Sequence, residues 1–240
     1  MTKGRLLYEG KAKKIFEILE NSHQVLVEFK NSLTAFNAQK KGEFEGKGRL
    51  NCQISTLLFQ TLAKNQISSH YQKTISDHEM IVDRVEIIPL EVVVRNVIAG
   101  SLAKKLGRSE GERLKAPLVE FYFKDDALGD PFVSDDQILA FEWATLQEIE
   151  NLKAQALKIN QILQKIFFEA GILLVDFKIE FGRRSNGEII LADEISPDCA
   201  RLWDLKTQEK MDKDRFRRDL GKIDESYQTV YLRLKEVLHG

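Results

Sequence analysis

The alternation of hydrophobic and polar residues predicts that this chain begins with short strands and continues into a mixture of strands and helices. Residues 13–18 and 25–29 lie on either side of the turn signal Asn21-Ser22 and are typical of the strands of a meander. Over residues 49–64 and 145–170 the hydrophobic residues recur instead at helical spacing. Gly171 follows the longer of these helical segments, as expected for a helix C-terminus.

Further elements follow from the same patterns. The remaining strands are predicted at residues 6–9, 81–82, 85–88, 91–95 and 118–123, and the remaining helices at residues 99–106, 207–220 and 223–238. Strands and helices do not alternate regularly, which favours an α+β fold with mostly antiparallel sheets. We expect a small, sheet-rich nucleotide-binding domain at residues 1–85 and a larger α+β domain at residues 86–240 that binds substrate and metal. The active site is then expected in the cleft between them.

Two acidic segments in the last third of the chain are joined by Asn186-Gly187. This dipeptide favours a two-residue type I′ turn, because both residues tolerate a positive φ. A turn with these residues at its centre pairs Ser185 with Glu188. The sequence therefore predicts an antiparallel hairpin of known register.

That register places Glu180 directly opposite Asp193, on the same strand face as Lys178. Like charges in a directly opposed pair are destabilising unless a cation lies between them. The cation that we predict is Mg²⁺, which binds one or two carboxylates together with substrate phosphates. The competing interpretation is an ordinary strand with a solvated, charged face.

Composition excludes several classes of protein. Hydrophobic residues make up 43% of the 240 residues, charged residues make up 30%, and the net charge of −1 lacks the basic excess typical of nucleic-acid binding. No segment approaches the ~20 apolar residues of a membrane span, and the N-terminus has no apolar signal core. Two distant cysteines and four scattered histidines form no zinc or redox motif. We expect a cytoplasmic protein that binds neither nucleic acid nor membrane.

The segment Gly10-Lys11-Ala12-Lys13 lies between two predicted strands and is a candidate phosphate-binding loop. Glycine lets the backbone approach a ligand closely, and lysines supply point charges for phosphate. The loop resembles the nucleotide-covering hairpin of kinase-like or ATP-grasp lobes and lacks the spacing of a Walker A loop. The competing interpretation is a plain turn with solvated lysines.

A second candidate for anion binding combines Arg95, at the end of an apolar strand, with Ser101, at the start of a predicted helix. Arginine, a hydroxyl and a helix N-terminus all favour a phosphate. Arg201 follows the second acidic segment and is expected to reach the same cleft. A helix cap beside a surface arginine is the competing interpretation.

The segments LVDFKIEFG at residues 174–182 and DEISPDCARLWD at residues 193–204 closely resemble the family of phosphoribosylaminoimidazole-succinocarboxamide synthases, or SAICAR synthetases. The resemblance continues through residues 8–13, 93–96, 99–102 and 211–217 and covers essentially the whole chain. It implies a two-domain SAICAR synthase-like fold. It also implies ATP-dependent joining of L-aspartate to the carboxylate of carboxyaminoimidazole ribotide in purine biosynthesis, with Mg²⁺ and an acyl phosphate.

The resemblance also implies roles for individual residues. The residues expected in catalysis are Lys178, Glu180 and Asp193. Of these, Glu180 and Asp193 are also expected to bind the metal ion. Those expected to bind ATP are Gly10, Lys11, Ala12 and Lys13. Those expected to bind the ribotide are Arg95, Ser101 and Arg201. The residues expected in the substrate cleft are Lys124 and Asp130, to which the resemblance assigns no individual role.

Several points stay open. Asn37 stands where many relatives carry aspartate, which puts any role at that position in doubt. A small-molecule kinase that phosphorylates a hydroxyl, or a non-catalytic nucleotide-binding module, is the alternative function. The sequence is compatible with a homodimer but does not specify the oligomeric state. It also does not identify the residues that bind aspartate.

Overall fold

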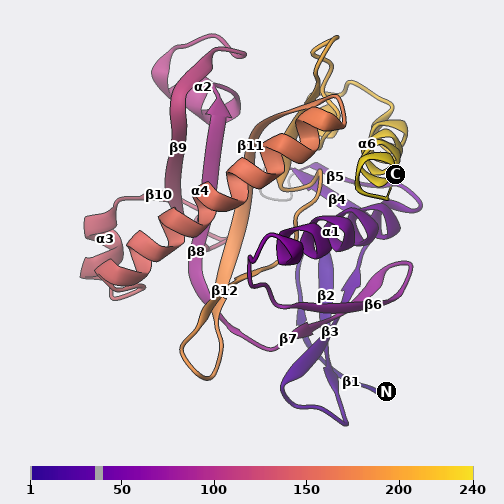
Figure 1. Ribbon diagram of the computed structural model, residues 1–240, viewed down its shortest axis with the longest axis vertical. Helices are drawn as coiled ribbons and strands as arrows, with labels where there is room; N and C mark the ends of the chain where they lie inside the picture. Colours follow the sequence, from indigo (N-terminus) through magenta and orange to yellow (C-terminus); the bar gives the residue numbers. More distant parts are fainter. Residues whose placement is uncertain (1, 36–39, 240) are drawn as a thin grey trace.

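The structure is a computed structural model that describes residues 2–35 and 40–239. Asn37 lies outside the described residues, so the structure does not test the prediction about that position. The described chain mixes helices with sheets in which the neighbouring strands run antiparallel, which confirms the predicted α+β fold class (Figure 1). No helix in the described part of the chain is long and apolar enough to cross a membrane.

The first sheet is formed by the N-terminal part of the chain. Its strands, in spatial order, are β1 (Lys3–Glu9), β2 (Lys13–Ile18), β3 (Gln24–Phe29), β7 (Glu79–Asp83) and β6 (Tyr71–Ser76). A separate two-stranded sheet pairs β4 (Ser32–Ala35) with β5 (Lys40–Glu43). The strands predicted at residues 13–18 and 25–29 are confirmed as β2 and β3.

The second sheet is formed by the rest of the chain. Its strands, in order, are β10 (Phe132–Val133), β9 (Arg113–Phe123), β8 (Glu86–Val97), β11 (Ile172–Arg183) and β12 (Ile189–Ala192), and β13 (Ala200–Asp204) also pairs with β11. Strand β11 is therefore flanked by β8 on one side and by β12 and β13 on the other. The chain leaves the first sheet after Asp83 and enters the second sheet at Glu86, where the sequence predicted a boundary. The division into two domains stays a prediction.

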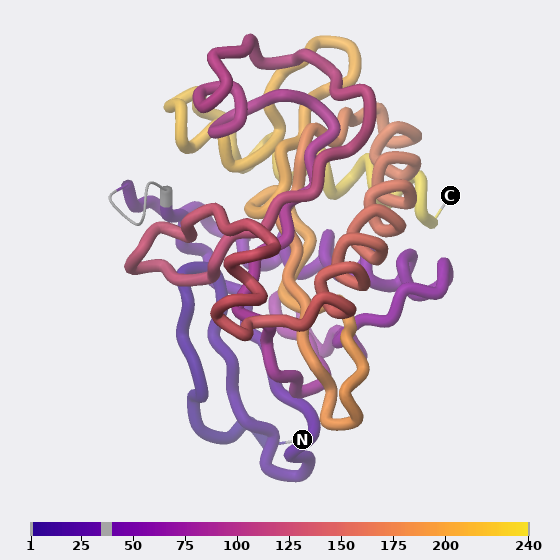
Figure 2. The backbone as a smooth tube through the Cα atoms, turned by 90° about the vertical axis from the view of Figure 1, so that its left-hand side faces the viewer, coloured from indigo at the N-terminus to yellow at the C-terminus, as the bar shows by residue number. Residues whose placement is uncertain are grey.

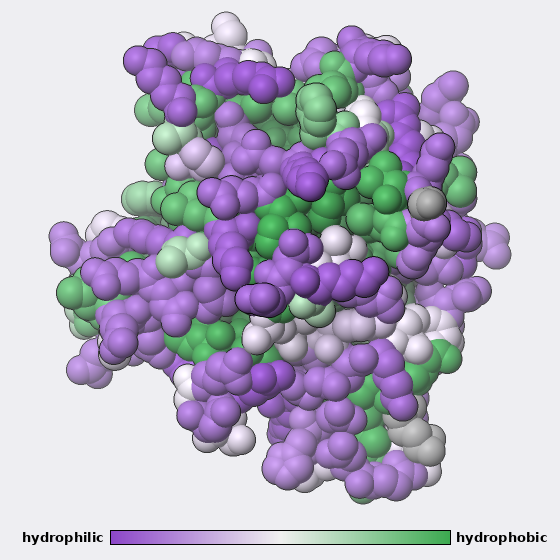
Figure 3. Space-filling model, viewed as in Figure 1, coloured by the Kyte–Doolittle hydropathy of each residue, from purple (hydrophilic) through white to green (hydrophobic). Residues whose placement is uncertain are grey.

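The longest helix, α4 (Leu146–Glu169), covers one face of the second sheet (Figure 1). The other described helices are α1 (Lys47–Lys64), α2 (Gly100–Leu106), α3 (Asp135–Ala140), α5 (Asp214–Arg217) and α6 (Ile223–His239). Helix α4 crosses this face diagonally, and α1 and α6 lie beside it (Figures 1 and 2). Residues from these three helices and from β8 and β11 share the largest hydrophobic core. On the surface of the same side, hydrophobic side chains gather in patches between hydrophilic ones (Figure 3).

The helix predicted at residues 145–170 is confirmed as α4, whose ends carry strong local signals. Thr145 and Glu148 form a capping box at its start, where each side chain bonds the backbone N–H of the other residue. Gly171, at φ +69°, follows its last turn. The helix predicted at residues 207–220 is wrong: only α5 forms there, because the chain turns back at Asp204 and Lys210 pairs with Trp203.

The two strands predicted on either side of Pro89 are one strand, β8. Between Glu91 and Ile87 the pairing with β11 shifts register, and Pro89 lies within this irregularity. A proline inside a sheet is tolerated at such a bulge, because its missing N–H interrupts no ladder hydrogen bond.

Candidate functional site

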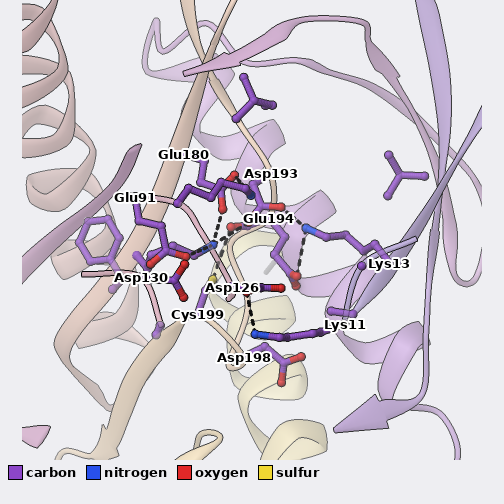
Figure 4. Close-up of a pocket in the computed structure, with 18 of the residues that line it drawn as sticks. Lys11, Lys13, Glu91, Asp126, Asp130, Glu180, Asp193, Glu194, Asp198 and Cys199 are labelled. Carbon is purple, nitrogen blue, oxygen red and sulfur yellow. Dashed lines mark hydrogen bonds and ion pairs between the residues drawn. The ribbon is translucent and has the colours of Figure 1, made fainter. Parts of the chain in front are cut away.

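A pocket of about 890 Å³ lies between the two large sheets. Apolar residues of the first sheet, such as Val25 and Val27, line one wall, and strands β8 and β11 supply polar residues to the other. Most of the charged side chains that the sequence singled out meet here (Figure 4). The structure therefore places the candidate residues around one cavity at the junction of the sheets.

Strand β11 divides its side chains between this pocket and the core. Phe177 and Ile179 are buried in the hydrophobic core beneath the helices. Asp176, Lys178 and Glu180 alternate with them and line the pocket. This alternation, which the sequence predicted, is the direct consequence of the period-two geometry of a strand.

The predicted register of the hairpin is wrong by one residue. Glu180 pairs with Ala192 rather than with Asp193. The reason is the turn: Gly187 N–H donates to the Arg184 carbonyl and Arg184 N–H donates to the Glu188 carbonyl, so the loop contains three residues instead of two. Only Gly187 of the Asn-Gly pair has a positive φ, +84°. A type I turn followed by glycine in a left-handed conformation has this form.

Asp193 nevertheless reaches the pocket, because the strand ends just before it. Its φ is +63°, a left-handed conformation that is uncommon outside glycine but more accessible to aspartate and asparagine. Its carbonyl accepts a hydrogen bond from His70 Nε2 at 3.0 Å. Burial lowers the pKa of His70 to about 4, so the ring is neutral and can hold this tautomer near pH 7. His70 thus supports the backbone turn that directs the carboxylate of Asp193 into the pocket.

The residue directly opposite Glu180 on β8 is Glu91, so a like-charge cross-strand pair does exist. The cation between the carboxylates is the ammonium of Lys178. Its Nζ lies 2.6 Å from Glu180 Oε1, 3.1 Å from Asp193 Oδ2 and 3.4 Å from Glu91 Oε1. Burial alone lowers the pKa of Lys178, but the nearby carboxylates of Asp193, Glu180 and Glu91 outweigh it and raise this pKa well above its usual value.

Two more lysines neutralise the same carboxylates. Lys13 forms an ion pair with Asp193 and lies 3.2 Å from Glu194, and Lys124 Nζ lies 2.5 Å from Glu180 Oε2. Figure 4 shows Lys13 approaching the acidic group from the side opposite Glu91. Burial raises the pKa of Asp193, yet the lysines, Lys13 foremost, hold it well below its usual value. The pocket therefore presents carboxylates interleaved with ammonium groups.

We tested this group of side chains as a magnesium site. Glu180 and Asp193 supply oxygen atoms of the kind that Mg²⁺ prefers. Among the described residues, however, no three His, Cys, Asp or Glu side chains form a ready-made metal cage. The residues therefore fit a cation that takes most of its ligands from substrate phosphates and water, with the lysine ammonium groups moving aside. A zinc-like site made of protein ligands alone does not fit.

The predicted anion-binding arginines form a second cluster around Asp176. The sheet places this aspartate directly between Arg95 on β8 and Arg201 on β13. Arg95 Nη1 lies 2.9 Å from Asp176 Oδ2, and Arg201 Nη1 lies 2.8 Å from the same oxygen. Ser101 Oγ is 3.4 Å from Arg95 Nη2. The three residues that the sequence grouped together are therefore close in space.

Gly100 makes the approach of Arg201 feasible. Its φ is +56°, and a Cβ atom built on it would lie only 2.3 Å from Arg201 Nη2. Any side chain at this position would both strain the backbone and displace the guanidinium. The glycine before Ser101 is thus part of the arginine cluster.

The Gly10–Lys13 segment lies at the edge of the pocket, at the turn between β1 and β2. Gly10 N–H donates to the Lys13 carbonyl at 2.9 Å and closes the turn. Lys11 reaches across to the second sheet, where its Nζ lies 2.7 Å from Asp126 Oδ1 (Figure 4). Asp130, from the same loop as Asp126, also lines the pocket. The plain-turn interpretation does not account for Lys13, whose side chain is only 15% exposed.

Several pocket residues were not found from the sequence. These are His70, Glu91, Asp126, Glu194 and Asp198. Glu91 had a signal: it interrupts an apolar strand four residues before Arg95, which places both side chains on one face. The others reach the pocket from loops and strand ends and had no local signal. Cys199 lines the pocket as well, but burial raises the pKa of its thiol to about 12, which makes it a poor nucleophile.

Carboxylates interleaved with lysines beside a pair of arginines, all in one pocket between two sheets, are typical of enzymes that act on phosphate-bearing substrates. Comparison with known proteins agrees. The family model described as SAICAR synthetase matches residues 6–234. The chain therefore belongs to the SAICAR synthetase family, which confirms the resemblance noted in the sequence.

Individual relatives are similar over nearly their whole length. A phosphoribosylaminoimidazole-succinocarboxamide synthase of Lysinibacillus sphaericus is 54% identical over 234 residues, which cover 98% of this chain and 99% of that protein. The crystal structure of such a synthase from Ehrlichia chaffeensis is 45% identical, with a TM-score of 0.94 and coverage of 96% and 98% of the two chains. A SAICAR synthetase in complex with ADP is also 45% identical, with a TM-score of 0.92 and coverage of 95% and 97%.

Proposed function

We propose that this protein is an ATP-dependent ligase that joins L-aspartate to the carboxylate of 5-amino-1-(5-phospho-D-ribosyl)imidazole-4-carboxylate, the carboxyaminoimidazole ribotide. The products are SAICAR, ADP and phosphate, in purine biosynthesis. The observation that carries the proposal is the placement of two cationic clusters and a group of carboxylates in one pocket of a chain that belongs to this family. We expect a cytoplasmic enzyme, and its oligomeric state stays open.

The chemistry requires activation of a carboxylate. A carboxylate is a poor electrophile, because an oxide would have to leave. When a carboxylate oxygen attacks the γ-phosphorus of ATP, ADP leaves and an acyl phosphate forms. The amine of aspartate then attacks the acyl carbon, phosphate leaves, and the nitrogen loses a proton. Positioning and charge neutralisation at the transferring phosphoryl group are the main tasks of the protein.

The nucleotide end of the reaction is assigned to the first sheet. Gly10 and Ala12 would bring the backbone close to ATP, and Lys11 and Lys13 would bind its phosphates. Lys11 would exchange its ion pair with Asp126 for a phosphate, since that pair is exposed and weak. Bound Mg²⁺ would supply positive charge to the phosphates and the reacting carboxylate.

The centre of the pocket is assigned to the reacting groups. Glu180 and Asp193 would hold the metal ion. Lys178 is then free to neutralise the ribotide carboxylate or the charge that develops on the phosphoryl oxygens. Lys124 and Asp130 would line the substrate cleft beside them. All of these side chains line one cavity, which supports a common task.

The ribotide phosphate is assigned to Arg95, Ser101 and Arg201. Asp176 holds both guanidinium groups in place from between their strands. A phosphate could then accept hydrogen bonds from donors whose orientation is already set, which lowers the entropic cost of binding.

The direct test is turnover with defined substrates. The enzyme is mixed with ATP, Mg²⁺ and the ribotide, with and without L-aspartate, and ADP and the succinocarboxamide product are measured. The proposal predicts product formation that requires aspartate. A hydroxyl-phosphorylating kinase would instead consume ATP with an alcohol substrate, and a non-catalytic module would release no ADP. Absence of aspartate-dependent product would refute the ligase.

His70 is expected to affect turnover through Asp193. Replacing His70 with leucine removes the donor to the Asp193 carbonyl, so the carboxylate is held less precisely and kcat should fall about tenfold. His70→Gln keeps an N–H donor near the position of Nε2 and should retain most of kcat. Steady-state kinetics and thermal unfolding of both variants measure the effect.

The comparison of the two variants separates positioning from packing. If His70 only filled space, leucine and glutamine would both keep kcat and would differ in stability alone. A His70→Leu variant with normal kcat would contradict the positioning role.

A further inference from the structure

Residues 193–198, the β12–β13 segment, form neither helix nor strand, yet most of the segment is buried. Glu194, Ile195 and Ser196 are 4%, 0% and 1% exposed. Buried backbone groups outside a helix or a sheet must find their partners on neighbouring elements. The segment also carries the carboxylates of Asp193 and Glu194 into the pocket. The place of these two carboxylates therefore depends on what holds the segment.

One neighbour of the segment is a stripe of polar residues on α1. Lys47, Asn51 and Ser55 are spaced four residues apart, so they share one face of the helix, and each is 0% exposed. Ser55 Oγ donates a hydrogen bond to the Ile195 carbonyl at 3.1 Å. Lys47 forms an ion pair with Asp198. Because lysine is almost never fully buried unless it is paired, the contact with Asp198 accounts for a lysine at this position.

Asp198 is held from α6 as well. Tyr227, which is 0% exposed, donates a hydrogen bond from its hydroxyl to Asp198 Oδ1 at 2.7 Å, and Lys47 lies against Oδ2. Burial raises the pKa of Asp198, but the partners of the carboxylate, Lys47 foremost, outweigh burial and hold this pKa below its usual value. Both oxygens thus have partners on the helices, although the side chain lines the pocket (Figure 4). Asp198 therefore anchors the end of the segment.

Hydrogen bonds inside the segment continue from this anchor toward the ATP side of the pocket. Asp198 N–H donates to Ser196 Oγ at 3.2 Å, and the Ser196 hydroxyl donates to Glu194 Oε2 at 2.6 Å. Glu194 Oε1 in turn lies 3.2 Å from Nζ of Lys13, the lysine assigned to the ATP phosphates. A continuous series of contacts therefore joins the two helices to that lysine.

We propose that Lys47, Ser55 and Tyr227 are positioning residues of the ligase, which fix the β12–β13 segment and so orient the proposed metal ligand and the phosphate-binding lysine beside it. This inference rests on the proposed ligase function. None of the three residues lines the pocket, so they act on the reaction only through the segment. A misplacement of reacting groups by about 1 Å can cost about 10²-fold in rate, which is the loss that these contacts would prevent.

A role in stability alone is the competing interpretation. A buried ion pair is weak evidence for such a role, because well-packed hydrophobic residues of similar volume are often as stable or more stable. The contacts through Ser196 and Glu194 to Lys13 also give the network a consequence inside the pocket. Positioning changes kcat and the local order of the segment, whereas a role in stability alone changes only the unfolding temperature.

The principal test is Tyr227→Phe, which removes one hydroxyl and keeps the ring that packs edge-on against Phe44. With saturating substrates kcat should fall about tenfold, and KM for the ribotide should stay within about threefold of wild type, because the arginine cluster is untouched. Lys47→Met should lower kcat further, by about 10²-fold, because Asp198 loses its cation. Should Lys47→Met fail to fold, Ser55→Ala takes its place and should resemble Tyr227→Phe.

Amide hydrogen exchange gives a readout that does not depend on turnover. In Tyr227→Phe the amides of residues 194–199 should exchange at least about tenfold faster than in the wild type, because exchange reports local opening. Mass spectrometry of peptides that span the segment measures these rates in the free enzyme.

Two variants serve as matched controls. Tyr231→Phe removes a tyrosine hydroxyl one turn further along α6, outside the pocket lining. Leu152→Ala opens a cavity at a 0% exposed position of α4, which should lower the unfolding temperature while every contact described for the segment is kept. Both controls should leave kcat and the exchange of residues 194–199 unchanged.

The outcomes distinguish the positioning role from the function on which it rests. A wild-type enzyme without aspartate-dependent product would overturn both. Turnover by the wild type together with an unchanged kcat in folded Tyr227→Phe would overturn the positioning role alone. An equal fall of kcat in Leu152→Ala would also overturn it, by tracing the effect to lost stability. A lower kcat with faster exchange in the segment variants, and in neither control, would support it.

Discussion

Replacing Asp193 with asparagine is expected to lower kcat by about 10²–10³-fold while the protein remains folded. Asparagine keeps the shape of the side chain but removes the negative charge that lies between Lys13 and Lys178. The proposed metal ion would lose one of its two protein ligands. Glu180 and Glu194 still neutralise the lysines, which is why the fold should survive. Glu180→Gln should have a similar effect, and steady-state turnover with saturating substrates measures both.

The control for this prediction lies in the same hairpin. Glu188 pairs with Arg184 at the surface near the turn, far along the strand from the pocket residues, so Glu188→Gln should leave kcat within about twofold. Circular dichroism and thermal unfolding establish that each variant is folded. A folded Asp193→Asn enzyme that keeps more than a tenth of wild-type kcat would rule out a central role for this carboxylate.

Replacing Asp176 with alanine is expected to lower the free energy of unfolding by about 3–5 kcal/mol. Asp176 is 3% exposed and is the shared partner of Arg95 and Arg201. Its removal leaves two guanidinium groups side by side in a buried place with one carboxylate fewer. The cost arises from the uncompensated charges rather than from lost packing. Denaturant titration at neutral pH measures the change.

An exposed ion pair provides the contrast. Glu112 pairs with Arg108 on the surface, where both side chains are about half exposed, so Glu112→Gln should cost less than about 1 kcal/mol. Equal losses of unfolding free energy in Asp176→Ala and Glu112→Gln would show that the arginine cluster stabilises the fold no more than an exposed ion pair does. In the Asp176 variant KM for the ribotide should also rise, since both arginines lose their common anchor.

The elements best predicted from the sequence are those whose period is regular and whose ends carry their own signals. Helix α4 was expected at residues 145–170, and its capping residue and closing glycine stand at those ends. The division of β11 into a core face and a pocket face was likewise predicted. Both depend only on the geometry of one element, which is why periodicity reveals them.

The hairpin shows where local reasoning fails. Asn186-Gly187 correctly predicts a tight turn, but the pair is compatible with a two-residue and a three-residue loop. The structure uses the longer loop, and one extra residue shifts the register from Asp193 to Ala192. In a regular strand such a shift would direct Asp193 to the opposite face. The positive φ of Asp193, supported by His70 from the loop just before β6, compensates for it.

The sequence by itself determined the family, the α+β class and the residues that line the pocket face of β11, because motifs and strand alternation are local properties of the chain. Only the tertiary structure decided which charges meet. Glu91 opposite Glu180 and Asp176 between two arginines both depend on strands distant in sequence. Electrostatic pairing acts over a few ångströms in space, and no local pattern encodes which distant residues the fold brings within that range.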